Sequence, residues 1–329
     1  MKAKQHDNDL YVGIDIGGTK CSVILGDIEG RIVQKCRFPT LTDLGSRQAL
    51  DNIGDSVDKM LGGSPHQACA IGISCGGPLD PVRGIIQSPP NLPGWDDIHI
   101  TEDLEDRFGI QVFLQNDANA CALAEHRFGA GRGCKNIVFL TFGTGLGAGI
   151  ILDGRLYEGS TGMAGEVGHI RLADDGPIGF GKAGSFEGFC SGGGIAQLAR
   201  SYIQKRVAPD ESAPFFGAAG DIESVTAETV GTAALAGNQL AREILEISGF
   251  WLGKGLSIII DMLNPEVIVI GSIFARCREI FLPAAEKVIE AEALHMAARA
   301  CRIVPPALGE TIGDMAAICT AVDGRIARD

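Results

Sequence analysis

Two short segments of the sequence combine glycine and threonine in a pattern suited to holding phosphate. The first lies between Asp15 and Lys20, and the second lies between Thr141 and Gly149. In each, an apolar run precedes the glycines, and a second apolar run and a polar turn follow them. Glycine lets the backbone turn sharply, and the N–H groups at such a turn form a concave site for anions. One such turn is more often ordinary hairpin chemistry. A pair, one in each half of the chain, indicates a duplicated architecture that grips a polyphosphate.

Two other phosphate-binding patterns are excluded by what surrounds these glycines. The stretch from Gly143 to Ala148 matches a dinucleotide-binding pattern, but a strand and a turn are expected after it where that pattern requires a helix. The first segment ends in Thr-Lys but lacks the four-residue spacer of a P-loop. The pair therefore predicts a phosphotransferase. Asp15 is expected near a metal ion, and Lys20 is expected to meet phosphate as a point charge.

Asp117 is the candidate catalytic residue. It follows the expected strand 111–114 and Asn116, and it begins the expected helix 118–128. Ligands of α/β sheets bind beyond the carboxyl ends of strands. Asn and Asp at this position are also ordinary helix caps. Transfer of a phosphoryl group to an alcohol needs a carboxylate that orients the hydroxyl and takes its proton. The helix N-terminus is expected to lower the pKa of Asp117 and to make it a weak base.

A second polar cluster lies in the glycine-rich region from Glu158 to Gly194. It contains Glu166 and His169, and Glu187 follows further along the chain. Carboxylates accept hydrogen bonds from sugar hydroxyls, and neutral histidine can donate or accept. A single histidine is more often structural, but two acids and a histidine among so many glycines are difficult to assign to a packed core. The cluster indicates a polar pocket.

The elements that position these residues alternate between strand and helix, which favours an α/β fold with a mostly parallel central sheet. Thr101 is a plausible N-cap. Strands are expected within 10–38 and at 68–74 and 266–270, and helices at 46–61, 101–108, 227–263 (with glycine interruptions) and about 311–327.

Length and composition limit the class of protein. The 329 residues suffice for two domains, and 45% are hydrophobic. A boundary is expected near Asn116-Asp117, giving a small N-terminal α/β domain of residues 1–117 with about 305–329 and a large α/β domain of residues 118–304. The net charge of −13 argues against a nucleic-acid partner. The sequence has neither an apolar signal-peptide region nor a membrane-spanning stretch, and its ten cysteines form no Cys-x-x-Cys motif. A cytoplasmic protein is expected.

Together these segments resemble the ROK family of sugar kinases and sugar-responsive repressors, almost from end to end. The resemblance rests on seven motifs in order: Asp15-Ile-Gly-Gly-Thr-Lys20, Gly76-Gly-Pro78, Pro90-Asn-Leu-Pro-Gly-Trp95, Asn116-Asp-Ala-Asn-Ala120, Gly143-Thr-Gly-Leu-Gly-Ala-Gly149, Gly165-Glu-Val-Gly-His169 and Pro265-Glu-Val-Ile-Val-Ile-Gly271. It implies an actin-like ATPase (ribonuclease H-like) fold, with two α/β domains flanking a cleft that holds ATP, Mg²⁺ and a hexose. It also implies a homo-oligomer, expected to be a dimer.

The resemblance assigns a role to each candidate residue. Asp117 would be the catalytic base that phosphorylates a primary hydroxyl, most readily that of glucose. Fructose, allose, mannose, N-acetylhexosamines and β-glucosides remain alternatives. The sugar would be held by Gly77, Asn116, Asp117, Glu166, His169 and Glu187. The ATP phosphates would be held by Asp15, Gly17, Gly18, Thr19, Lys20, Thr141, Gly143, Thr144, Gly145 and Gly271.

Two further interpretations belong to the same family. A repressor would carry a helix-turn-helix module before the first phosphate segment, whereas only ten residues precede Tyr11. A sugar-binding protein without catalysis would not need Asp15, Lys20 and Asp117. The sequence therefore favours the kinase.

One motif of the family is absent. Members usually carry Cys-x-Cys-x-x-x-x-Cys after the histidine, and those cysteines bind a structural zinc ion with it. In this region the chain has only Cys190, which lies beyond Glu187. Because a structural zinc site needs four ligands, no zinc is expected. The region is expected to be held instead by Phe180, Phe186 and Phe189.

Overall fold

A computed structural model describes residues 9–62, 68–206 and 222–328. It consists of two compact units. The first unit comprises Met1–Arg132 and Leu308–Asp329, and the second comprises Gly133–Ala307. The division at Arg132 comes after the boundary predicted at Asn116-Asp117. Helix α3 (Asp117–Phe128) therefore belongs to the first unit.

A five-stranded mixed sheet forms the centre of the first unit. Its order is β3-β2-β1-β4-β7, in which β1 pairs with β2 and β2 with β3 antiparallel, and β4 pairs with β1 and β7 parallel. The strands are β1 (Leu10–Ile16), β2 (Lys20–Asp27), β3 (Ile32–Pro39), β4 (Ile71–Cys75) and β7 (Val112–Asn116). A short hairpin, β5 (Leu79–Asp80) and β6 (Ile85–Ile86), follows β4.

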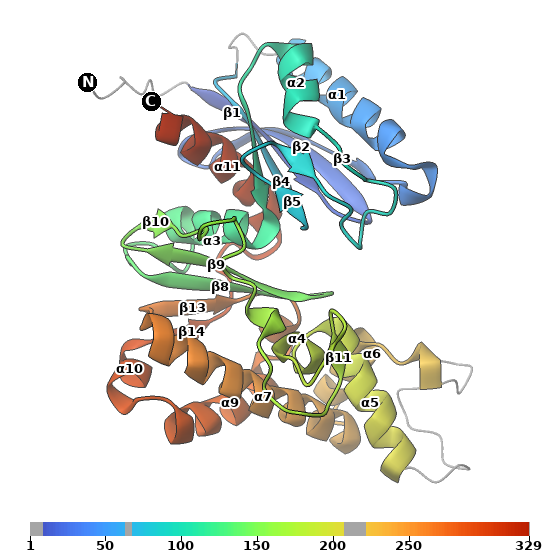
Figure 1. Ribbon diagram of the computed structural model, residues 1–329, viewed down its shortest axis with the longest axis vertical. Coiled ribbons are helices and arrows are strands. Elements are labelled where there is room, and N and C mark those ends of the chain that lie inside the picture. The colour runs from blue at the N-terminus through green and yellow to red at the C-terminus, as the bar shows by residue number, and fades with distance from the viewer. Residues whose placement is uncertain (1–8, 63–67, 207–221, 329) are drawn as a thin grey trace. The chain divides into compact units, whose positions relative to one another are not determined.

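Helices cover both faces of this sheet, as Figure 1 shows. Alternate residues of β1 point to opposite faces. Val12 and Ile14 pack in one apolar cluster with α1 (Ser46–Gly62) and α2 (Ile100–Phe108), whereas Tyr11 packs in another with α11 (Ile312–Arg328). The last helix of the chain therefore completes the core of the N-terminal sheet, and α3 packs beside it.

Two glycines let α11 lie directly on the sheet. A Cβ atom at Gly72 of β4 would be 2.2 Å from the nitrogen of Ala321 and 2.4 Å from the carbonyl oxygen of Ala317. One at Gly13 of β1 would be 2.9 Å from the nitrogen of Ile318. Because these atoms belong to the helix backbone, no side-chain rotation relieves the contact.

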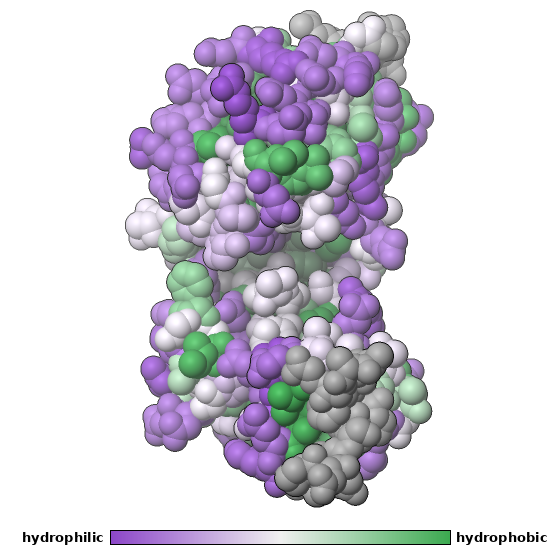
Figure 2. Space-filling model, turned by 90° about the vertical axis from the view of Figure 1, so that its right-hand side faces the viewer, coloured by the Kyte–Doolittle hydropathy of each residue, from purple (hydrophilic) through white to green (hydrophobic). Residues whose placement is uncertain are grey.

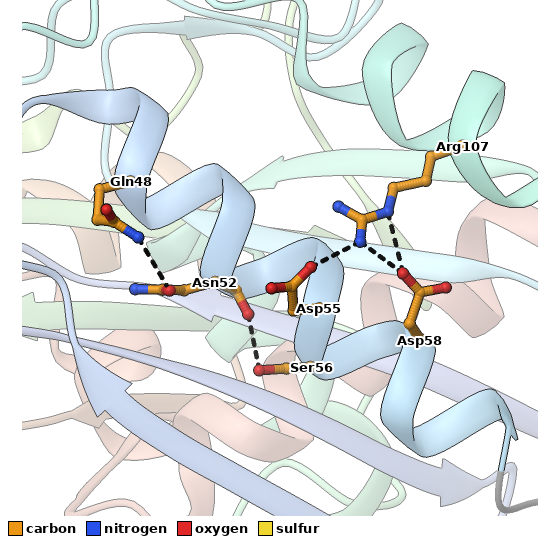
Figure 3. A network of polar contacts seen from close by, with 6 residues as sticks. All are labelled: Gln48, Asn52, Asp55, Ser56, Asp58 and Arg107. Atoms are coloured by element: carbon orange, nitrogen blue, oxygen red, sulfur yellow. Dashed lines mark hydrogen bonds and ion pairs between the residues drawn. The ribbon is translucent and has the colours of Figure 1, made fainter.

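On the opposite face of the sheet from α11, Arg107 of α2 connects α2 to α1 (Figure 3). Its Nη2 donates to Asp55 at 2.8 Å, and both Nη2 and Nε donate to Asp58 of α1. The guanidinium of Arg107 occupies the space that a side chain at Gly54 would fill. Exposed ion pairs of this kind contribute about 0–1 kcal/mol, so the network orients α1 against α2 more than it stabilises them.

The second unit has a sheet of the same plan. Its order is β10-β9-β8-β13-β14, in which β8, β9 and β10 are antiparallel neighbours, and β13 pairs with β8 and β14 parallel. The strands are β8 (Ile137–Phe142), β9 (Leu146–Leu152), β10 (Arg155–Leu156), β13 (Val267–Ile270) and β14 (Arg302–Val304). A small hairpin consists of β11 (Ile178–Gly179) and β12 (Lys182–Ala183). The helices are α4 (Phe186–Phe189), α5 (Gly192–Arg206), α6 (Ala227–Leu235), α7 (Gln239–Leu263), α8 (Ile273–Arg276), α9 (Arg278–Glu292) and α10 (His295–Ala300).

The sequence predictions are largely confirmed at the level of elements. The two glycine segments form the corners between β1 and β2 and between β8 and β9. The second segment is followed by strand β9 and not by a helix, which agrees with the prediction that it is not a dinucleotide-binding site. The prediction of a mostly parallel sheet is wrong, because each sheet contains as many antiparallel as parallel pairings. Thr101 is not the N-cap of α2. The N-cap is His99. Thr101 lies within the first turn of α2, and its hydroxyl packs against Gly84.

The visible surface is predominantly hydrophilic, with hydrophobic side chains in separate areas (Figure 2). Among the described residues, no helix is long and apolar enough to cross a membrane.

Candidate active site

The β1–β2 corner of the first unit is closed by backbone contacts. The N–H of Gly17 donates to the carbonyl of Lys20 at 3.1 Å, and the hydroxyl of Thr40 donates to the carbonyl of Gly17 at 2.5 Å. A Cβ atom at Gly18 would be 2.5 Å from the carbonyl oxygen of Asn91, so only glycine fits there. Thr19 and the side chain of Lys20 are exposed. The corner thus presents a backbone turn and one cation to solvent, which suits an anion.

Asp15, near the end of β1, is surrounded by other charged groups of the first unit. The pKa of Asp15 is raised to about 6, mainly by burial and in smaller part by the charges of Asp314 and Asp117. Lys20 and Lys35 act in the opposite direction. Lys35 also donates to Asp314 at 2.5 Å. Asp15 therefore lies among carboxylates whose mutual repulsion a bound cation would relieve.

This raised pKa predicts a pH dependence of stability. A carboxyl whose pKa is higher in the folded state stabilises the fold most below its ordinary pKa of 3.8, and this contribution is lost as pH rises through about 6. Relative to wild type, Asp15→Asn should gain about 3 kcal/mol of unfolding free energy between pH 3.5 and pH 7. Urea titrations at both pH values measure this difference. Asp51→Asn, at an exposed position of α1, is the control. An equal change in the two variants would contradict the prediction.

Asp117 and Asn116 share the N-terminus of α3 but differ in role. Asn116 is the N-cap, and its Oδ1 accepts from the N–H of Ala118 at 2.9 Å. Oδ1 of Asp117 accepts from the same N–H at 2.8 Å. Oδ2 of Asp117 lies 3.8 Å from where a Cβ atom at Gly76 would stand. The helix is therefore capped without Asp117, and one oxygen of Asp117 is directed toward the Gly76 turn.

The expectation that the pKa of Asp117 is lowered is wrong in direction. Its pKa is raised, because desolvation by the surrounding protein outweighs the hydrogen bonds from the backbone N–H groups of Ala118 and Asp117, which lower it. The side chain nevertheless retains exposed surface. Asp117 is accordingly a stronger base than the sequence indicated.

Asn91 is a further candidate for the site, which its residue type and position in the sequence alone did not indicate. It lies between β6 and α2, and its carbonyl oxygen packs against Gly18. Its side-chain amide lies 3.5 Å from the Cβ position of Gly76, beside the carboxylate of Asp117. The only sequence signal was its place in the Pro90–Trp95 motif. Asn116 is nearby, since its Nδ2 lies 3.4 Å from the Cβ position of Gly77.

The β8–β9 corner of the second unit carries Glu187. Oε2 of Glu187 accepts from the N–H of Leu146 at 3.0 Å and lies against Gly145. The N–H of Gly143 donates to the carbonyl of Gly145, and the carbonyl of Gly143 accepts from the N–H of Gly192 at 2.7 Å. The carboxylate of Glu187 is therefore fixed at the same glycine corner that was expected to bind phosphate.

The other predicted residues of the second unit fall into two groups. Thr141 is turned to its own hairpin, since its hydroxyl accepts from the N–H of Gly147 at 2.9 Å. Gly271 follows β13, and its N–H donates to the carbonyl of Leu140. Glu166 and His169 are exposed near the short helix that ends at His169, and Thr144 is exposed at the corner.

The segment that lacks the cysteine motif is anchored to α7 by packing. Phe189 stacks on Trp251 with ring centroids 4.1 Å apart, and the hydroxyl of Ser248 donates to the carbonyl of Phe189 at 2.7 Å. Phe186 is fully buried against Gly255, where a Cβ atom would be 2.2 Å from its ring. Phe180 does not help to hold the segment as predicted. It is 76% exposed, and its ring lies edge-on to the ring of His169.

Two phenylalanine variants test whether packing on α7 holds this segment in place. Phe189→Ala should lower the free energy of unfolding by about 3–5 kcal/mol, because it leaves a cavity beside Trp251. Phe180→Ala should change it by no more than about 0.5 kcal/mol. Chemical denaturation monitored by Trp fluorescence measures both. Equal effects of the two substitutions would show that the segment is not held by packing on α7.

The metal content of the purified protein tests the prediction that the chain, which lacks the cysteine motif, binds no structural zinc. Within the described parts of the chain, no group of three or more His, Cys, Asp or Glu residues is placed to hold a metal ion. The purified protein should contain no stoichiometric zinc, and EDTA should leave its Tm unchanged, because packing replaces metal ligation. Elemental analysis that finds one zinc per chain would contradict this prediction.

Comparison with known proteins places this arrangement among characterised relatives. The model of the ROK family matches residues 11–322. The chain is 34% identical over 281 residues to a glucokinase of Thermotoga maritima, an alignment that covers 85% of this chain and 87% of the relative. It is 29% identical over 299 residues to the DNA-binding transcriptional dual regulator NagC of Escherichia coli, covering 86% of this chain and 68% of the relative.

The fold has a solved counterpart. A ROK family glucokinase from Streptomyces griseus, in complex with glucose and AMPPNP, superposes with a TM-score of 0.77 at 28% identity, covering 96% of this chain and 100% of the other. The predicted actin-like ATPase fold is thereby confirmed.

Proposed function

Because the chain belongs to the ROK family, we propose that it transfers the γ-phosphoryl group of ATP to the primary hydroxyl of a hexose, with glucose as the preferred substrate. The broader activity, that of an ATP-dependent sugar kinase, follows from its glucokinase relatives and from the solved glucokinase complex. Glucose is chosen because the relatives at about 34% identity are named glucokinases. The product would be glucose 6-phosphate.

The observation that carries the proposal is the environment of Asp117. One carboxylate oxygen accepts from the helix N-terminus, and the other is directed toward the turn where Gly76 and Asn91 meet. The negative charge of Asp117 also raises the pKa of Asp15, which lies near the β1–β2 corner. The residue proposed as the base and the corner proposed to bind phosphate belong to the same unit, and Asp117 and Asp15 are close enough to interact electrostatically.

In the proposed reaction, Asp117 accepts a hydrogen bond from the attacking hydroxyl and takes its proton as the new P–O bond forms. Its raised pKa makes it a better proton acceptor than an ordinary aspartate. Since the transition state of phosphoryl transfer is loose, the carboxylate acts largely by orienting the hydroxyl in line with the γ-phosphate. Asn91 and Asn116 would bind the sugar beside it, together with Glu166, His169 and Glu187.

Phosphate binding is assigned to the two glycine corners. The proposed donors are the backbone N–H groups of Gly18 and Thr19 at one corner and of Thr144 and Gly145 at the other, and Lys20 would add one positive charge. The N–H groups of Gly17 and Gly143 close the corners themselves. Asp15 suits Mg²⁺, which binds oxygen ligands and usually combines one or two carboxylates with water and phosphate. Burial is the main cause of the raised pKa of Asp15, and the nearby charges of Asp314 and Asp117, which also raise it, would favour a cation there. When bound, the ion would neutralise charge on the β- and γ-phosphates.

Measurement of ADP release tests the proposal. The purified protein is incubated with MgATP and each of glucose, fructose, allose, mannose, N-acetylglucosamine and a β-glucoside. Glucose should give the highest kcat/KM, and NMR of the product should show the phosphate on the 6-hydroxyl. A higher value for another hexose would replace glucose as the preferred substrate. Absence of sugar-stimulated turnover would contradict the kinase.

Similarity to NagC favours a second candidate, a sugar-responsive regulator of the same family. A regulator would bind its sugar without phosphorylating it. Isothermal titration calorimetry distinguishes the two, since sugar binding without ADP release in the same preparation supports the regulator.

A further inference from the structure

The tip of the β11–β12 hairpin combines an exposed aromatic side chain with an unfavourable backbone conformation. Gly179 pairs with Lys182, so Phe180 and Gly181 form a two-residue turn. Their φ angles are 43° and 74°. Turns with two positive φ angles favour Asn, Asp and Gly, and a bulky residue there is an outlier. Burial does not compensate for this conformation, since Phe180 is 76% exposed. Backbone outliers of this kind cluster at functional sites.

The hairpin is anchored between two residues that are proposed to bind the sugar. Nζ of Lys182 donates to the carbonyl of His169 at 2.8 Å. A Cβ atom at Gly179 would lie 2.8 Å from Cβ of Glu187, so the hairpin packs on the first turn of α4 (Figure 1). The turn that carries Phe180 therefore has a fixed position relative to both His169 and Glu187.

The ring of Phe180 faces the imidazole of His169. The two ring centroids lie 6.3 Å apart, and the planes are inclined at 76°. Both side chains are exposed. A hexose that hydrogen-bonds to the imidazole of His169 would therefore lie within reach of the aromatic ring. Ligand sites typically combine a few polar groups, which fix orientation, with aromatic surface.

The C–H groups of a hexose offer apolar surface to such a ring. In the β anomer of glucose every ring hydroxyl is equatorial, so both faces of the sugar present axial C–H groups. Mannose carries one axial hydroxyl on one face, and allose carries one on the opposite face. An aromatic ring packed on a face with an axial hydroxyl would desolvate that hydroxyl without a hydrogen bond, which is unfavourable.

We propose that Phe180 is a specificity-determining residue of the sugar site. Its ring packs on one apolar face of glucose and selects glucose over the epimer that has an axial hydroxyl on that face. The inference rests on the proposed function, because it names what distinguishes glucose within the same site. It also accounts for an exposed phenylalanine at a turn that favours other residues.

Steady-state measurement of ADP release with glucose, mannose and allose tests this role. Phe180→Ala should raise the KM for glucose about threefold to tenfold, the usual contribution of one aromatic contact. The kcat should stay within about twofold, because the ring touches no reacting atom. For one of the two epimers, the KM (or the Ki against glucose, where the epimer is not phosphorylated) should change by less than about twofold. That epimer identifies the face on which Phe180 packs.

Further substitutions separate contact with the sugar from an effect on the hairpin. Phe180→Tyr keeps the aromatic face and should retain the wild-type KM. Phe180→Asn suits the turn, so it should raise the Tm by about 2 °C while raising the KM for glucose as Phe180→Ala does. A structural role would instead improve or leave unchanged the KM of this more stable variant. Phe250→Ala is the control, since it removes an exposed aromatic ring from α7 of the same unit and should leave all three sugars unaffected.

The same measurements distinguish failure of this inference from failure of the proposed function. A wild type without sugar-stimulated turnover would contradict the kinase, and the role of Phe180 with it. Normal turnover of glucose by wild type, combined with an unchanged KM in Phe180→Ala, would overturn the role of Phe180 alone. An equal rise in KM for all three hexoses would overturn it as well, because the ring would then not discriminate between epimers.

Discussion

Replacement of Asp117 by asparagine is expected to lower kcat about 10²–10⁴-fold, the range over which general bases contribute. The substitution keeps the size of the side chain and removes the proton acceptor. Asn116 caps α3 independently, so the helix should remain intact. The dissociation constant for glucose should stay within several-fold of wild type, because binding does not require proton transfer. Steady-state kinetics and calorimetry measure these two quantities.

A matched control distinguishes catalysis from loss of charge at a helix end. Asp103 also lies in the first turn of a helix and is exposed, so Asp103→Asn makes the same chemical change on α2. It should leave kcat unchanged. If Asp117→Asn retained near wild-type kcat, Asp117 would be a structural residue of the α3 terminus and the base would lie elsewhere.

Gly72→Ala is expected to cost the first unit about 3 kcal/mol of stability, at the upper end of the usual cost of overpacking. The added methyl group would meet the backbone of Ala317 and Ala321, so α11 must move away from β4. For a unit of this size the Tm should fall by about 6–12 °C. Differential scanning calorimetry measures the shift.

Gly62→Ala is the appropriate control. Gly62 lies at the end of α1, and no atom of the residues that the structure describes lies within 4 Å of its Cβ position. Alanine there should not lower the Tm. A similar fall for both variants would mean that the loss reflects glycine chemistry in general rather than contact between β4 and α11.

The glycine corners, the strand ahead of Asp117 and the helix after it could be predicted because they are local. Each depends on residues adjacent in sequence: apolar runs for β1 and β8, glycines for the corners, and Asn116 for the cap. The motif order likewise identified the family without knowledge of the structure.

What could not be predicted depends on contacts between distant segments. Desolvation by surrounding segments raises the pKa of Asp117. This effect outweighs the N-terminus of the following helix, which the sequence does indicate and which lowers the pKa. Asn91 becomes a candidate for the site only because its loop returns to Gly18 and Gly76. Phe180 and Phe189 look alike in sequence, yet only Phe189 finds Trp251 on α7.

The division of the first unit between both ends of the chain has a consequence for how the protein is made. A ribosome completes β1 and β4 early, but α11, which covers one face of them, is translated only after the whole second unit. The second unit forms from a continuous stretch and can fold while the first still lacks this cover. Until α11 arrives, Tyr11, Ile24 and Ala70 have no apolar partners from residues 318–322. A nascent chain stalled before Ile312 is therefore a substrate for chaperones and proteases.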